Sequence, residues 1–486
     1  MKTIQLDILA HADFSGRIRQ TRDLPGLSRF AYEINQIRHK NPDGTLLLDA
    51  GDQFCCNYWG GVPVAKAQNL ICTDAMCLGN HEFDWGEEFL QEAVQAAEFP
   101  VLCANIIEKD THQYVTGVKP WVILEKAGVK IGILGLTTEY TPYMVTASYF
   151  APYQVADTVN ISIQMIADMK QAGAELIVVL SHFPFYIDKD GISGELPKIM
   201  AKLPKTDVFV GGHIPGDYAD VYQDTVVLKA GFGGKSLAHA RLLLDPQTKT
   251  IVKRECTIIP VGVKGQRDTT ALEYEQKVTN PFSDFFETKL AELDERWELH
   301  LSEECKLGNF LADAMRKSGN TDIAYMNATC GGGALEPGAV TKQDIVEVTG
   351  FNDPIYTGIM TGKQIHELFE LVYVPERYGN NAGLLFSGLC VTIDHTQPAF
   401  HKIKKITLPD GRMIQDKQSY TVATSEYMSS GGNDTGQIAN QIQWHNTNLR
   451  FHDVLFDYAK KQGKLKVDPQ TRLIETGTPQ NNHAPF

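Results

Sequence analysis

The chain lacks long hydrophobic runs and an excess of positive charge, and both absences restrict its function. Apolar runs such as Leu176–Leu180 are far shorter than the roughly 20 residues that a membrane-spanning helix needs. The N-terminal segment MKTIQLDILAHADFSG is interrupted by Asp7, Asp13 and Ser15, so it does not fit the apolar region of a signal peptide. A formal net charge of −14 at pH 7 argues against a nucleic acid or an anionic membrane as the main partner.

The cysteines do not form the pattern of a disulfide framework. There are nine of them, an odd number, and they are scattered along the chain. We therefore expect a cytoplasmic protein. A small anionic substrate remains compatible with the negative charge, because bound divalent cations reverse the local field.

Length and patterning predict an α/β protein of more than one domain. A chain of 486 residues is too long for a single core. In its first half, short apolar runs alternate with amphipathic segments at Leu27–His39, Glu87–Glu98 and Asp157–Gln171, which indicates a layered α/β domain. The expected strands are Ile4–His11, Thr45–Asp49, Ala75–Leu78, Val129–Leu136, Glu175–Leu180, Asp207–Val210 and Thr225–Lys229.

A charged, helix-like stretch separates the two halves. The segments EYEQKV and FFETKLAELDERWE have the pattern of a connecting helix with one exposed face. Beyond them, a helix at Asn309–Lys317 and a strand at Asp322–Met326 begin a second α/β domain. We expect an N-terminal domain at residues 1–265, a linker-helix region at 266–304 and a C-terminal domain at 305–486.

Five of the expected strands are followed by a polar residue suited to a metal. Each of these residues alone is more typical of a turn, a cap or a partly buried histidine. Ligands bind beyond the carboxyl ends of strands in open α/β sheets, so the ordered set favours a common site. Its members are Asp13, Asp52, Asn80, His182 and His213.

The motifs around these residues resemble those of a known family. In order and spacing, ADFSG, DAGDQF, GNHEFD, LSHF and GGHIPG resemble the metal-binding motifs of the 5′-nucleotidase/2′,3′-cyclic phosphodiesterase family, within the calcineurin-like metallophosphoesterases. The second half extends the resemblance with CKLGNFLADAMR, MNATCGGGAL, FSGLCVTID and TSEYMSSGGND. The resemblance implies a four-layer α/β metallophosphoesterase domain followed by an α/β substrate-binding domain of the 5′-nucleotidase type.

The resemblance also implies a metal-dependent reaction on a small phosphate ester, expected to be a nucleotide or a nucleotide-like phosphomonoester. Two divalent cations such as manganese or zinc would share Asp52, hold the attacking hydroxide and clamp the phosphoryl oxygens. Asn80, His182 and His213 would complete one metal site, and Asp13 would serve the other.

Two residues of GNHEFD are expected to assist the chemistry. His81 would stabilise the charge that develops on the phosphate or protonate the leaving oxygen. Asp84 would orient the His81 ring. These roles are implied by the resemblance.

The sequence departs from the family in the first metal site. The family's Asp-x-His is DFS at residues 13–15, and its GHxH ends in proline at residue 215. Both missing histidines normally serve the metal nearer Asp13, so we expect one or two ions per chain. His11, Ser15, Cys55 or Cys56 are candidate substitutes. We favour the simpler interpretation that His11 is a strand residue and that the cysteines are packing groups.

The nucleoside pocket departs from the family as well. Asn327 and Phe351 match a base-contacting asparagine and a stacking aromatic residue. Gly332 and Glu303, however, stand where arginines are expected. Thr435 stands where the family's GGDG motif is usually followed by an aromatic residue. Each lost arginine removes charge-assisted hydrogen bonds of roughly 1.5–3 kcal/mol. We therefore expect an ordinary mononucleotide to bind poorly or differently.

These departures leave two alternatives to a phosphatase. The first is a non-catalytic protein that keeps one structural metal and binds a small ligand, and metal content measured together with turnover distinguishes it. The second is a different reaction on a related ester, as in the thiosulfohydrolase relatives. No residue in the sequence specifically requires that second reaction.

Overall fold

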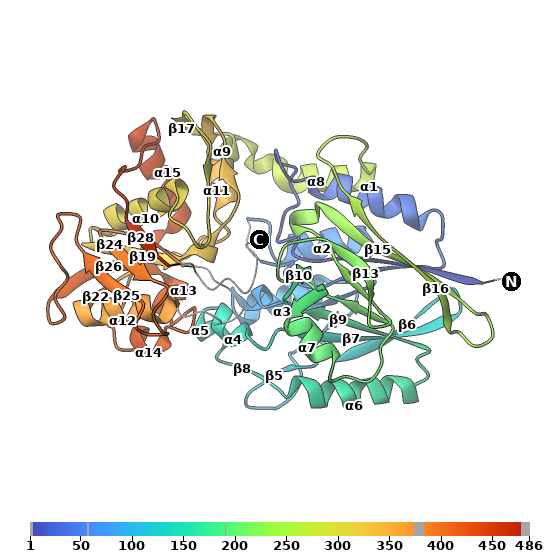
Figure 1. Cartoon of the computed structure of the whole chain (residues 1–486). Helices are drawn as coiled ribbons and strands as arrows, with labels where there is room; N and C mark the ends of the chain where they lie inside the picture. The colour runs from blue at the N-terminus through green and yellow to red at the C-terminus, as the bar shows by residue number, and fades with distance from the viewer. Residues whose placement is uncertain (1–2, 56–57, 190, 374–382, 478–486) are drawn as a thin grey trace. The chain divides into compact units, whose positions relative to one another are not determined.

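The computed structural model describes residues 3–55, 58–189, 191–373 and 383–477 and consists of two compact units. The N-terminal unit contains residues up to 145 and 149–281, and it runs from blue to green in Figure 1. The C-terminal unit contains residues 146–148, 282–373 and 383–477 of the described chain, and its part from residue 282 onward runs from yellow to red. Among the helices of the described ranges, none is both long and apolar enough to span a membrane.

Two six-stranded sheets form the centre of the N-terminal unit. The first sheet has the order β16 (Ile251–Pro260), β15 (Ser236–Leu244), β1 (Ile4–His11), β2 (Thr45–Asp49), β3 (Ala75–Cys77), β4 (Val101–Leu102). The second has the order β13 (Tyr218–Tyr222), β14 (Thr225–Lys229), β12 (Val208–Val210), β9 (Leu176–His182), β7 (Val129–Thr137), β6 (Trp121–Lys126). Strands β1 to β4 are parallel, and so are β14, β12, β9 and β7.

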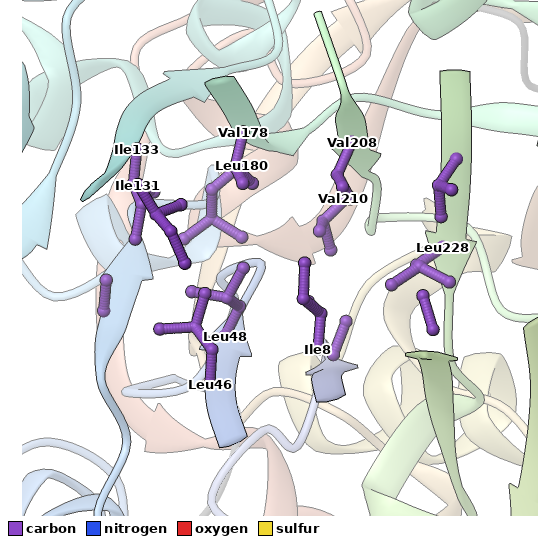
Figure 2. Close-up of a cluster of buried hydrophobic side chains, with 14 of the residues drawn as sticks. Ile8, Leu46, Leu48, Ile131, Ile133, Val178, Leu180, Val208, Val210 and Leu228 are labelled. Atoms are coloured by element: carbon purple, nitrogen blue, oxygen red, sulfur yellow. The ribbon is translucent and has the colours of Figure 1, made fainter. Parts of the chain in front are cut away.

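The main core lies between the two sheets. Ile8, Leu46 and Leu48 of the first sheet face apolar side chains of the second sheet (Figure 2). Burial of one such side chain contributes about 1.5–3 kcal/mol, so this interface is a major source of stability. The facing residues in the second sheet are Ile131, Ile133, Val178, Leu180, Val208, Val210 and Leu228.

Helices cover the outer faces of both sheets. Figure 1 shows α1 (Gly26–Arg38) and α8 (Thr269–Thr279) on one side of the strands and α6 (Thr158–Gln171) on the other. Helix α6 begins after Asp157, whose carboxylate accepts the N–H of Asn160, and it packs Ile166 and Met169 against the second sheet. The four layers confirm the predicted fold class. Other helices of this unit are α2 (Val62–Leu70), α3 (Glu87–Ala96), α4 (Thr141–Met144) and α7 (Glu195–Met200).

Two small antiparallel pairs complete this unit. They are β5 (Ile106–Glu108) with β8 (Tyr153–Val155), and β10 (Phe185–Asp188) with β11 (Gly191–Gly194). All seven strands and all three helices expected in this half are present, with bounds that differ by at most two residues.

The C-terminal unit contains a five-stranded sheet of order β23 (Leu384–Ser387), β19 (Ile323–Asn327), β26 (Ser419–Ser425), β22 (Pro354–Thr361), β27 (His445–Arg450). A three-stranded sheet has the order β25 (Ile403–Thr407), β24 (Cys390–Asp394), β28 (Leu473–Thr476). Side chains from both sheets and from α12 (Gly362–Val372) share one core. The longer helices are α10 (Lys306–Gly319), α11 (Lys342–Val348) and α15 (Phe451–Gln462).

The prediction of a helix over the second half of the linker region is wrong. Helix α8 ends at Thr279, and only the short α9 (Ser283–Phe286) follows. Strand β17 (Lys289–Leu293) then pairs with β21 (Gly338–Thr341), and β18 (Trp297–Glu298) pairs with β20 (Ala334–Leu335). Strand pairing with distant residues overrides the local helical pattern, because β structure depends strongly on its neighbours.

Candidate active site

The five predicted metal-ligating residues all lie at the carboxyl ends of parallel strands. Asp13, Asp52 and Asn80 follow β1, β2 and β3, while His182 ends β9 and His213 follows β12. One ligand atom each from Asp52, His182 and His213 lies within 4.8 Å of the others. The structure therefore joins residues from both sheets into one cluster.

The His182 ring is held between a carbonyl and a carboxylate. Its Nδ1 lies 2.6 Å from the Ala50 carbonyl oxygen, which can only accept, so Nδ1 carries a proton. Its Nε2 lies 2.9 Å from Asp52 Oδ2. Burial opposes the charged ring, but the Asp52 carboxylate outweighs this effect and raises the pKa of His182 to about 9. A cation bound between Nε2 and Asp52 would displace the second proton.

Asn80 and His213 bring uncharged atoms that could bind a metal to the same cluster. His213 Nδ1 lies 2.9 Å from Asn80 Oδ1. Burial and the neighbouring His182 lower the pKa of His213 to about 3, so its ring is neutral. Asn80 is fully buried, and its Nδ2 has no hydrogen-bond partner among the described residues. A carboxylate, an amide oxygen and two imidazoles fit a divalent cation of the manganese or zinc type.

The Asp13 side of the cluster does not fit a second cation. Asp13 Oδ2 accepts the backbone N–H of His213 at 3.1 Å. The Ser15 hydroxyl donates to the Asp52 carbonyl oxygen at 3.2 Å, which occupies its proton. Pro215 has no side-chain donor. Within the described part of the chain, the cluster of possible His, Cys, Asp and Glu ligands does not include Asp13.

The candidate substitute ligands do not join the cluster in the described ranges. His11 is buried with Nε2 3.7 Å from Asp49 Oδ2, and its ring meets Phe30 edge-on at 5.0 Å. Burial lowers the pKa of His11 to about 3. Cys55 is also buried, and Cys56 lies outside the described residues.

His81 and Asp84 form the expected pair. Nδ1 of His81 lies 2.7 Å from Asp84 Oδ2, and the backbone N–H of His81 donates to Asp52 Oδ1 at 2.9 Å. The second contact ties the His81 backbone directly to the metal cluster.

Glu82 is a further residue of the site, and no role for it was expected from the sequence. It is fully buried, and its carboxylate accepts four backbone N–H groups that belong to the loops after β2 and β3. The donors are Asp52 at 2.9 Å, Gln53 at 2.6 Å, Phe54 at 2.9 Å and Gly79 at 2.6 Å. Its position inside GNHEFD, between His81 and Asp84, is the sequence feature that points to it.

The backbone of the cluster adopts unusual conformations. Asp13, Asp52 and His213 have φ values of 54°, 57° and 71°, and Ser15 has 51°. Such left-handed conformations are uncommon outside glycine and concentrate at functional sites. Three of the five predicted ligands are thus held in conformations that local sequence does not favour.

Two glycines leave room for the ligands. A Cβ on Gly79 would lie 2.1 Å from Asp52 Oδ1, and one on Gly212 would lie 2.8 Å from His182 Nδ1. Any larger residue would displace the ligand atoms, so the glycines of GNHEFD and GGHIPG are required by close approach.

In the C-terminal unit, the loops that carry Asn327 and Phe351 lie side by side. The N–H of Gly350 donates to the Cys330 carbonyl at 2.8 Å, which connects the two loops. Asn327 is 7% exposed and donates from Nδ2 to a neighbouring threonine hydroxyl. Contact of either residue with a substrate stays a prediction.

Comparisons with known proteins agree with this geometry. The family model for calcineurin-like phosphoesterase matches residues 17–217, and that for the 5′-nucleotidase C-terminal domain matches residues 290–440. The 5′-nucleotidase of Diplobatis ommata is 26% identical, over 97% of this chain and 90% of its own. Human 5′-nucleotidase is also 26% identical, over 98% of this chain and 92% of its own.

Solved structures share the fold across both units. The 5′-nucleotidase precursor of Thermus thermophilus has a TM-score of 0.85 at 21% identity, covering 98% of this chain and all of that one. The sulfate thiohydrolase SoxB of Thermus thermophilus has a TM-score of 0.80 at 15% identity, covering 99% and 98%. At these identities the likeness shows the fold alone. The two family models, which match the two halves of the chain in order, and the relatives show that the chain belongs to the 5′-nucleotidase family of calcineurin-like phosphoesterases and is an enzyme of the phosphatase type.

Proposed function

We propose that the protein hydrolyses a small phosphomonoester with a nucleotide-like leaving group, using a divalent cation held by Asp52, Asn80, His182 and His213. The observation that carries this proposal is the convergence of donor atoms from these residues at one sheet edge, beside the His81–Asp84 pair. When bound, the cation would activate water and polarise the phosphoryl oxygens.

The chain's own residues would orient the reaction around this cation. Asp84 holds His81 by its Nδ1, so Nε2 is the atom that gives a proton to the leaving oxygen or donates a hydrogen bond to the phosphate. Asp52 positions both the metal cluster and His81. One of its carboxylate oxygens lies next to His182, and the other accepts the backbone N–H of His81. A movement of Asp52 would therefore disturb metal binding and proton transfer together.

Asn327 and Phe351 are the proposed contacts to the leaving group, as the resemblance implies. Since Gly332 and Glu303 replace arginines, the proposed substrate is a phosphate ester whose binding does not depend on those cations. The scattered cysteines support a reducing compartment, and we propose a cytoplasmic location, which fractionation of the native host cell would test.

An activity screen over nucleotides, cyclic nucleotides and simple phosphate esters tests the proposal. The protein is loaded with manganese, zinc or cobalt, and metal content is measured on the same sample. His81→Ala should reduce kcat by roughly 10²–10⁴-fold. His39→Ala, at an exposed histidine that follows α1, is the matched control. Tightly held metal without turnover of any ester, and no effect of His81→Ala, would sink the proposal.

A further inference from the structure

A polar pocket lies in the C-terminal unit, apart from the residues proposed to act in the reaction. Its volume is about 530 Å³, which is the size of a small-molecule binding site. Its walls are formed by the end of α10, the turn after β23, the end of α15 and the segment that leads to β28. Among the described residues that line it, none is a predicted metal ligand or substrate contact.

The charge of this pocket is opposite to that of the chain. Among its described lining residues, five side chains are cationic and two are anionic, whereas the chain has a formal net charge of −14. One of the two carboxylates, Asp313, is paired with Arg472 at 2.8 Å. At the edge, Lys464 pairs with Asp294 at 2.7 Å. The pocket still presents an excess of positive charge to a ligand. The cationic residues are Arg316, Lys317, Lys464, Lys466 and Arg472.

A buried hydrogen-bond network positions Arg316 in the pocket wall. Arg316 Nε donates to Ser387 Oγ at 2.8 Å, and the Ser387 hydroxyl donates to Asp313 Oδ1 at 2.5 Å. Ser387 and Asp313 are 1% and 7% exposed, and Arg472 holds the other oxygen of Asp313. The Arg316 guanidinium is therefore oriented by groups that are themselves fixed in the protein interior.

Gly388 leaves the space that the Arg316 side chain occupies. Its φ is 84°, and a Cβ there would lie 3.1 Å from Arg316 Cδ and 2.1 Å from the Asp322 carbonyl oxygen. A larger residue would crowd the arginine and strain the backbone. The turn after β23 is thus shaped to accept this arginine.

Arg316 keeps most of its hydrogen-bonding capacity for a ligand. Of its guanidinium N–H groups, only the one on Nε has an acceptor among the described residues. The Lys317 ammonium lies 3.0 Å from the Tyr458 hydroxyl, and within the described ranges neither it nor the Lys466 ammonium pairs with a carboxylate. A guanidinium binds an oxyanion through two parallel hydrogen bonds, and ammonium groups add charge. Phosphoryl groups carry more charge and more acceptor oxygens than a carboxylate, so they match this set best.

We propose that this pocket binds a small molecule carrying a diphosphate group, held by Arg316 and by the ammonium groups of Lys317 and Lys466. Binding here needs no metal, because the protein supplies the positive charge. Inorganic pyrophosphate and a nucleoside diphosphate share the recognised group. The volume of the pocket favours the larger of the two.

Calorimetric titration of the full chain tests the proposal. A chelator first removes bound metal, so that the metal cluster does not recruit phosphate. The probes are inorganic phosphate, inorganic pyrophosphate and ADP. We expect pyrophosphate and ADP to bind roughly tenfold or more tightly than phosphate, since they offer further charge-assisted contacts. No saturable binding of either diphosphate, or phosphate binding as tight as theirs, would overturn the proposal.

Three variants locate the binding site. Arg316→Gln should weaken pyrophosphate binding by roughly 10–100-fold, as expected for loss of a charge-assisted contact. Lys466→Met, at an exposed lysine, should weaken it by roughly threefold. Arg296→Gln, at an exposed arginine of the same unit that does not line the pocket, is the matched control and should bind as wild type does.

Circular dichroism shows which variants keep the fold. Equal pyrophosphate affinity in folded Arg316→Gln and wild type would contradict the proposal. If Arg316→Gln does not fold, equal affinity in Lys466→Met and wild type contradicts it instead. An equal loss of affinity in Arg296→Gln would show that overall charge, and not this pocket, determines binding.

Discussion

The backbone N–H of Asp52 donates to the Glu82 carboxylate at 2.9 Å, so a predicted metal ligand is positioned by a residue without a predicted role. In wild type, the two carboxylate oxygens of Glu82 together accept four backbone N–H groups. In Glu82→Gln only one side-chain oxygen remains to accept them. We expect the free energy of unfolding to fall by about 2–4 kcal/mol and the metal to bind less tightly. Thermal unfolding and metal titration measure both effects. Glu88→Gln, at an exposed glutamate of α3, should change neither, and an equal response of the two variants would contradict the role of Glu82.

Gly79→Ala should damage the site by direct collision. The new Cβ would lie 2.1 Å from Asp52 Oδ1 and 2.7 Å from Asp52 N. Overpacking of this kind costs about 1–3 kcal/mol and would move the ligand atom. We expect bound metal and activity to be lost together. Gly262→Ala, where the nearest atom to the new Cβ is 3.7 Å away, should keep its bound metal and its activity. Full activity of Gly79→Ala would contradict the predicted collision with Asp52.

Asp84→Asn separates the orientation of His81 from metal binding. Asp84 contacts His81 at 2.7 Å and is not part of the metal cluster in the described residues. The amide keeps the shape of the side chain and removes its charge, so kcat should fall by roughly 10–100-fold at constant metal content. Steady-state kinetics and metal analysis test this, with the exposed Asp110→Asn as control. An unchanged kcat would leave Asp84 with a structural role only.

Gly332→Arg tests whether a missing arginine weakens nucleotide binding. A Cβ at Gly332 meets no atom within 4 Å, and no left-handed φ is required there, so the side chain has space. We expect KM for a mononucleotide to fall by roughly 10–100-fold, as for one restored charge-assisted contact. Gly332→Ala adds no charge and should leave KM unchanged. If both variants shift KM equally, the arginine's charge is not the cause.

Glu195 should make stability depend on pH. Burial raises the pKa of Glu195 from 4.5 to about 7, although the Thr138 hydroxyl at 2.5 Å and the Glu139 N–H at 2.9 Å donate to it. The folded chain holds this proton more tightly than the unfolded chain, so the free energy of unfolding falls as pH rises between these two values.

Glu195→Gln should remove that part of the pH dependence. Relative to wild type, the variant should gain up to about 3 kcal/mol between pH 4.5 and pH 7. Denaturant unfolding at several pH values measures the difference. Glu92→Gln, at an exposed position of α3, should run parallel to wild type. A parallel curve for Glu195→Gln as well would show that the carboxyl group has the same pKa in the folded and the unfolded chain.

The sequence predicted the strands and the positions of the metal-ligating residues because both depend on local pattern. An apolar run followed by Asp13, Asn80 or His213 indicates a strand and the position of its carboxyl end directly. The strand β17 could not be predicted in this way, since its pairing with β21 is decided by residues about fifty positions further along the chain. Lys229 was placed correctly in a strand, but the burial of its side chain against Phe185 depends on tertiary packing.

The left-handed backbone at Asp13, Asp52 and His213 sets the stability of the fold against the side chains that the site needs. Each position destabilises the metal-free fold by on the order of 1 kcal/mol, and glycine would relieve that strain. Replacement of Asp52 or His213 by glycine would therefore remove a proposed ligand and make the metal-free protein harder to unfold.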